Sequence, residues 1–143
     1  MMTAFLDQIS ARLTATGIPA QLIEEAYDPS QPHHGTLIFQ ADCLTLRFTR
    51  DHGQDFLDIA TALAPREFYW FGDIEVAMGW GSLERILSRA AAPPIDEVIN
   101  RLGQHVAELR KAFFKNIDHF THARIARTMR RPDSRTHSSR PTP

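Results

Sequence analysis

The side chains most able to carry out acid–base chemistry lie close together in the segment FTRDHGQDFLDIA, residues 48–60. This segment places Arg50, Asp51, His52 and Asp55 within six positions. A histidine beside carboxylates can act as a general base that a neighbouring acid orients. The same letters also suit the corner of a β-hairpin, because Asp and Gly are common turn residues. The two interpretations differ in the strand register that each requires.

The register of the flanking strands favours the hairpin. A four-residue loop over 51–54, built on a type I turn, places apolar residues opposite one another on one face and Arg47 opposite Asp58 on the other. A three-residue loop would instead place Leu46 opposite Asp58 and mix polar with apolar partners on each face. Gly53 supplies any positive φ that the turn requires. The cluster is therefore predicted to be a turn and not a catalytic site.

The seven histidines of the chain raise the question of a metal site. His119 and His122 lie one helical turn apart, with Asp118 beside them and His105 fourteen positions upstream. Two imidazoles at this spacing can share a metal, but no third ligand stands at a recognisable spacing. These histidines are predicted to be exposed or half-buried, and no metal is expected.

Nucleophilic and phosphate-binding motifs are also incomplete. Ser82 in GWGSLE resembles a nucleophile elbow, but Glu84 occupies the position that this motif gives to glycine. The glycines at 72, 79 and 81 lack the spacing and the lysine of a phosphate loop. Acidic pairs such as Glu24 and Glu25 could serve glycoside hydrolysis, but nothing in the sequence indicates a cleft. The sequence therefore predicts no catalytic residue, no cofactor and no enzyme.

Composition is typical of a single globular domain. The chain has 143 residues, of which 43% are hydrophobic and 23% charged. No apolar run is long enough to cross a membrane, and the N-terminus lacks the pattern of a secretory signal. Cys43 is the only cysteine, which excludes intrachain disulfides and cysteine-based zinc sites. We expect a cytoplasmic protein that does not bind membranes.

Charge is distributed unevenly along the chain. Residues 124–143 hold six arginines and one acidic residue, whereas residues 1–75 hold four arginines and eleven carboxylates. Arginines near the C-terminus could neutralise phosphates, but no aromatic residue interleaves with them and the acidic body would repel a polyanion. Nucleic acid is therefore not expected as a partner. The acidic part and the arginine-rich part of the chain could bind different partners, or they could contact each other within the fold.

Hydrophobic periodicity predicts an α+β fold. A helix over 3–15 ends at Gly17 and is followed by four antiparallel strands over 20–28, 35–40, 43–49 and 55–61. Asp73 is a candidate cap for a short helix over 74–78, and Ser82 for another that continues to 91. The helices that follow are expected to pack on one face of this four-stranded sheet.

The C-terminal part of the chain has a helical pattern from 94 to about 131. Apolar residues recur every three or four positions from Ile95 to Phe120, as one helix or as two joined near 116–118. Residues 132–143 are rich in Arg, Ser and Pro and have no apolar residue apart from proline, so we predict a disordered tail. Residues 1–131 are predicted to form one α+β domain.

The order of these elements resembles the small immunity-type proteins encoded beside bacterial polymorphic or contact-dependent toxins. In these proteins a strand ends in an Arg-Asp-x-Gly-Gln turn, which matches residues 50–54 here. A tryptophan near an aspartate then begins the next helix, as Trp70 and Asp73 would. The resemblance spans about residues 4–130 and implies no catalytic residue. It implies a protein that binds and occludes a cognate toxin.

We therefore expect a non-enzymatic module that binds another protein through an acidic sheet face. Acidic residues would steer a basic partner electrostatically, and the aromatic residues of the run 68–71 would either pack on the sheet or anchor that partner. The candidate contacts are Glu24, Glu25, Asp28, Asp55, Asp58, Glu67, Tyr69 and Trp70. The alternative is a self-associating or adaptor module that acts through the long C-terminal helix. Either a monomer or a homodimer fits the sequence.

Overall fold

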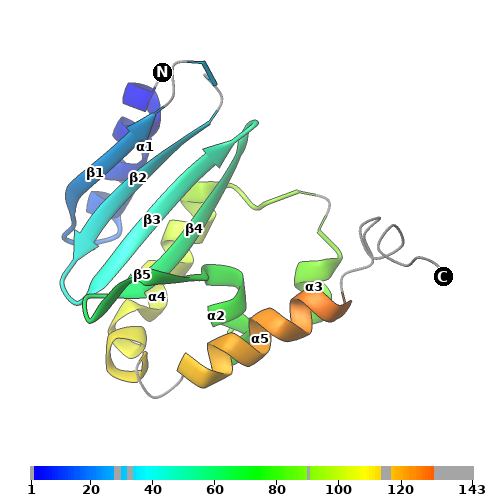
Figure 1. Ribbon diagram of the computed structural model, residues 1–143. Helices are drawn as coiled ribbons and strands as arrows, with labels where there is room; N and C mark the ends of the chain where they lie inside the picture. Colours follow the sequence, from blue (N-terminus) through cyan, green and yellow to red (C-terminus); the bar gives the residue numbers. More distant parts are fainter. Residues whose placement is uncertain (1, 28–29, 32–33, 90, 114–116, 131–143) are drawn as a thin grey trace.

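The computed structural model describes residues 2–27, 30–31, 34–89, 91–113 and 117–130. Helix α1 (Met2–Ala15) leads into a sheet, and further helices follow it (Figure 1). The strands are β1 (Gln21–Tyr27), β2 (His34–Ala41), β3 (Leu44–Asp51), β4 (Gln54–Thr61) and β5 (Ala64–Trp70). The later helices are α2 (Phe71–Met78), α3 (Leu83–Leu87), α4 (Ile95–Ala112) and α5 (Ile117–Arg130). The predicted α+β class with an N-terminal helix is confirmed.

The described residues form a five-stranded antiparallel sheet in the order β1-β2-β3-β4-β5, so the prediction of four strands was wrong. The strand that was missed is β5, whose Pro65, Arg66 and Glu67 obscure the alternation of apolar residues. Its pairing with β4 is also irregular, with a register shift after Ile59. An edge strand tolerates proline because one side of its backbone needs no partner strand.

The register predicted for the β3–β4 hairpin is confirmed. Arg47 is paired with Asp58, and the apolar residues of the two strands face one another. The turn is tighter than predicted, because the ladder continues to Asp51 and Gln54 and leaves a two-residue loop. His52 and Gly53 have φ of 51° and 82°, which makes this a type I′ turn and not the type I turn that was expected.

The core lies between one face of the sheet and helices α1 and α4, which run behind the sheet in Figure 1. Alternate residues of β2, β3 and β4 point into it and are almost fully buried, among them Leu37, Leu46, Phe48 and Ile59. Figure 1 looks onto the opposite face, where no described helix lies over β1–β4. The molecule thus has one covered and one open sheet face. No helix within the described ranges is long and apolar enough to span a membrane.

Two helices are described in the part of the chain after residue 94. Helix α4 ends at Ala112, and α5 begins at Ile117 and packs against α2 and β5. The apolar stripe of α4 is buried, with Ile99, Leu102 and Leu109 fully inaccessible. The predicted tail at 132–143 lies outside the described residues.

The short helices after the sheet were predicted less accurately. Helix α2 begins at Phe71, two residues before Asp73, so Asp73 is not its cap. Ser82 does cap α3, since its hydroxyl accepts a hydrogen bond from the Arg85 amide, but that helix ends at Leu87 and not at 91. A capping residue can be predicted only when the first residue of its helix is known.

The acidic first half and the arginines of the later helices meet inside the fold. The Arg101 guanidinium lies 2.7 Å from the Glu75 carboxylate, and that of Arg127 lies 2.8 Å from the Asp73 carboxylate. Both carboxylates are buried, and each arginine is mostly covered. Some of the acidic residues of the first half are therefore neutralised by ion pairs with arginines of the later helices.

Candidate partner-binding surface

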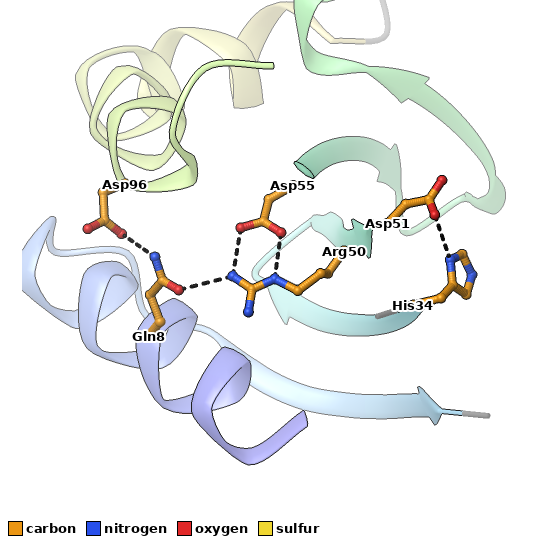
Figure 2. Close-up of polar contacts among 6 residues, drawn as sticks. All are labelled: Gln8, His34, Arg50, Asp51, Asp55 and Asp96. Atoms are coloured by element: carbon orange, nitrogen blue, oxygen red, sulfur yellow. Dashed lines mark hydrogen bonds and ion pairs between the residues drawn. The ribbon is translucent and has the colours of Figure 1, made fainter. Parts of the chain in front are cut away.

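The Arg50–Asp55 pair joins the β3–β4 hairpin to the helices (Figure 2). Arg50 donates from Nε and Nη2 to the two oxygens of Asp55, at 2.8 and 2.9 Å, and its Nη2 also donates to the Gln8 side chain. The Gln8 amide donates to Asp96 at the start of α4. The Asp55 hydrogen bond raises the pKa of Arg50. This arrangement ties the hairpin to α1 and α4 and engages both carboxylate oxygens of Asp55.

The histidine of the same segment lies on the tip of the turn. His52 Nδ1 is 2.6 Å from the Asp51 carboxylate, and His34 Nδ1 lies 3.6 Å from the same oxygen (Figure 2 draws the His34 contact). The hydrogen bond with His52 lowers the pKa of Asp51. His52 is 86% exposed, so the pair lacks the enclosed environment in which such a dyad could exclude water. The geometry agrees with a turn.

The candidate metal ligands are dispersed. His119 and His122 are exposed on α5, whereas His105 on α4 stacks against the Trp80 ring with centroids 4.0 Å apart. Across the described ranges, no three His, Cys, Asp or Glu side chains come close enough together to hold a metal ion. Ser82, the candidate nucleophile, is engaged as the cap of α3.

The described helices leave the open sheet face uncovered over β1–β4 (Figure 1). Its residues alternate with the buried core residues of the same strands. On β2, β4 and β5 it carries Ile38, Phe56, Phe68 and Trp70, all partly accessible. Thr36 and Thr49 on this face are also partly accessible, whereas Thr45 is buried. The centre of this surface is therefore apolar and weakly polar, with exposed carboxylates at its margins, Glu24 on β1 and Asp51 at the hairpin end.

Arg47 and Asp58 form an ion pair at the centre of the open face, and this pair carries no net charge. Arg47 donates from Nε and Nη2 to Asp58 Oδ2, at 3.3 and 3.0 Å, and its guanidinium lies over the Phe68 ring, 4.1 Å from the centroid. Burial raises the pKa of Asp58, against the opposing effect of the Arg47 hydrogen bond. Aromatic side chains and arginine are enriched in the cores of protein interfaces, where free carboxylates are depleted.

The predicted contact residues are divided among different parts of the fold. Glu24, Asp58 and Trp70 lie on the open face, while Glu25 and Glu67 are exposed elsewhere on the edge strands. The other predicted contacts are less available. Asp55 is held by Arg50 on the helix side, and Tyr69 is buried against Phe113 and Phe120. Asp28 lies outside the described residues.

The residues of the open face that sequence reasoning missed are Ile38, Arg47, Phe56 and Phe68. The signal that could have identified them was the strict alternation along β2, which separates buried Leu37 and Phe39 from partly accessible neighbours. Once the register of β3 and β4 is known, Arg47 and Phe56 fall on the same face as Ile38. No protein-family model, curated protein or solved structure matches the chain.

Proposed function

We propose that the chain is a non-enzymatic protein-binding module and that its open sheet face contacts the partner. The observation that carries this proposal is the contrast between the two faces of the sheet. One face is sealed by α1 and α4, and the other exposes aromatic side chains around the neutralised Arg47–Asp58 pair. A partner that covers the centre of this face would bury apolar area around a carboxylate that Arg47 already neutralises.

The partner class that best fits is a toxin domain with a basic surface, as for the immunity-type proteins that the sequence resembles. Eleven carboxylates and four arginines in residues 1–75 make the sheet half acidic, and exposed Glu24, Glu25 and Glu67 keep part of that charge at its edges. Such charge would accelerate association with a basic protein, while the apolar face would hold it. The candidate catalytic groups support a non-enzymatic role because Asp55 and Ser82 make structural contacts.

The test is a pull-down from the nuclease-treated cytosol of the native host, read by mass spectrometry, with wild-type and variant baits. Ile38→Arg and Thr49→Arg each place a long charged side chain on the open face, where Arg47 shows that one can be accommodated. Thr3→Arg makes the same kind of change on the exposed surface of α1 and is the matched control. We expect a stoichiometric protein retained by wild type and Thr3→Arg and lost from both open-face variants. Retention by all baits would contradict the proposal.

Self-association through the C-terminal helices is the second candidate, and one observation favours it. The stripe of α4 is used by the core, but α5 exposes Ile125 (48%) and Met129 (78%), one helical turn apart. A dimer through this stripe would persist at high salt because its contacts are apolar. Sedimentation of wild type and Met129→Arg discriminates the two functions. A salt-resistant dimer that Met129→Arg dissociates would favour self-association.

A further inference from the structure

The two edges of the sheet are protected to different degrees. At β5, α2 and α5 pack beside the strand, and Arg124 Nη2 donates to the Phe68 carbonyl at 2.8 Å. At β1, no described strand pairs with the outer side, and Figure 1 shows this strand at the far end of the sheet from α2 and α5. Most of its residues are exposed, including Ile23 at 54%. Among the described residues, the outer backbone of β1 over residues 21–26 is therefore open to another strand.

The charge of β1 decides which strand can pair there. The strand carries Glu24 and Glu25 at its middle and contains no basic residue. A second copy that paired antiparallel along β1 would bring these glutamates opposite or diagonal to their own equivalents, and like charges at such positions are destabilising. A segment that carries lysine or arginine opposite Glu24 would instead form an opposite-charge pair on the open face. Charge complementarity thus selects a basic partner over a second copy.

A groove beside the start of β1 adds an apolar contact. Its volume is about 480 Å³, and buried Leu13, Ile18 and Phe39 contribute to its lining. Pro19 and Ala20, which lead directly into β1, form another part of its wall. An extended segment along β1 could place an apolar side chain in this groove while its backbone bonds to the strand.

We propose that β1 takes up an extended, basic segment of the partner protein as an additional strand. Backbone hydrogen bonds along β1 would supply affinity, and a lysine or arginine opposite Glu24 together with an apolar residue in the groove would supply specificity. This inference rests on the proposed protein-binding function and adds a second contact, at the edge of the open face. The occupant is a segment of another protein.

The probe is a peptide of about eight residues, within the usual range of strand lengths, that alternates lysine with valine. Hydrogen exchange followed by NMR should show that this peptide slows exchange of the β1 amides and leaves those of β5 unchanged. Two further peptides, N-methylated at the odd or the even amides, remove the donors along one edge each. One of the two should lose binding. Equal binding by both would show simple charge attraction and would overturn strand addition.

Variants that reverse the charge of one glutamate test whether the segment that binds β1 is basic. Glu24→Lys should weaken binding of the lysine peptide about fivefold, because an opposite-charge pair becomes a like-charge pair. Glu108→Lys makes the same substitution on the exposed surface of α4, away from β1, and should leave binding unchanged. Equal binding of a peptide with glutamate in place of lysine would overturn the basic partner. A wild-type dimer with protected β1 amides would overturn it in favour of a second copy.

The partner found by pull-down separates this inference from the proposed function. If Ile38→Arg abolishes capture and Glu24→Lys has no effect, the open face binds the partner and strand addition at β1 is wrong. If neither substitution affects capture, both proposals fail. Weakened capture by Glu24→Lys, with capture by Glu108→Lys unaffected, supports the edge contact.

Discussion

Arg127 of α5 forms a two-point ion pair with the buried carboxylate of Asp73 in α2, with Nε–Oδ1 2.8 Å and Nη2–Oδ2 3.0 Å. The Asp73 side chain is 2% exposed and that of Arg127 is 21% exposed. The same guanidinium lies 5.0 Å from the centroid of the Trp70 ring. One arginine therefore fixes α5 both to α2 and to the last residue of the sheet.

Removal of Arg127 should destabilise the fold strongly. Arg127→Ala leaves Asp73 buried without its partner, and loss of one member of a buried pair costs about 3 kcal/mol in the free energy of unfolding. Arg66→Ala removes an exposed arginine from β5 and should change stability by less than about 0.5 kcal/mol. Urea denaturation of the two variants checks this prediction. Equal stability of both would show that the pair contributes little.

Gly72 gives a second prediction, on packing. A Cβ at this position would lie 2.5 Å from Cη2 and Cζ3 of the Trp70 ring, so Gly72→Ala must displace that ring. We expect a loss of about 1–3 kcal/mol, partly offset by the better helix propensity of alanine, and a shift in tryptophan emission. Gly81→Ala is the control, since its Cβ would find its nearest neighbour at 3.7 Å. A stabilised Gly72→Ala would contradict the packing of Trp70.

Local pattern sufficed where two faces of a strand differ in polarity. The register of β3 and β4 was predictable because any shift would have exchanged apolar and charged partners, as Leu46 and Arg47 illustrate. The type of the turn was not predictable, because the sequence does not give the φ angle of His52. Strand β5 was missed because Pro65 and the charges after it hide a strand that pairs irregularly at the edge.

Long-range contacts could not be predicted from the sequence. Asp73 has the spacing of a helix cap, but its partner lies 54 positions away on α5. The run of aromatic residues must alternate between faces, yet period alone does not say that Tyr69 is the buried one and Trp70 lies on the open face. The open face itself emerged only when the helices were placed on the other side of the sheet.

The raised pKa of Asp58 predicts that the free energy of unfolding depends on pH. Burial raises its pKa above 3.8, so the folded chain holds this proton more tightly than the unfolded chain does. Its contribution to the free energy of unfolding therefore increases as pH falls through the window between the raised value and 3.8. Wild type should gain stability relative to Asp58→Asn on acidification across this window. Urea titrations at several pH values measure the difference.

Asp51 should show the opposite sign, which makes Asp51→Asn the control for that experiment. The hydrogen bond with His52 lowers the pKa of Asp51, so its stabilising contribution is present above 3.8 and is lost as pH falls through the lowered folded value. Wild type should thus lose its advantage over Asp51→Asn on acidification. If the stability of wild type changed in the same direction relative to both variants, the direction of the pKa shift assigned to Asp58 or to Asp51 would be wrong.

The turn at residues 52–53 gives the last prediction. Gly53 has φ of 82° and no atom within 4 Å of an added Cβ, so any cost of substitution comes from the backbone alone. Gly53→Ala should lower the free energy of unfolding by about 1–2 kcal/mol, whereas Gly53→Asn should cost less because asparagine tolerates the left-handed region. Chemical denaturation of the two variants measures this order. If alanine proved no worse than asparagine, the hairpin would have to adopt another turn type in solution.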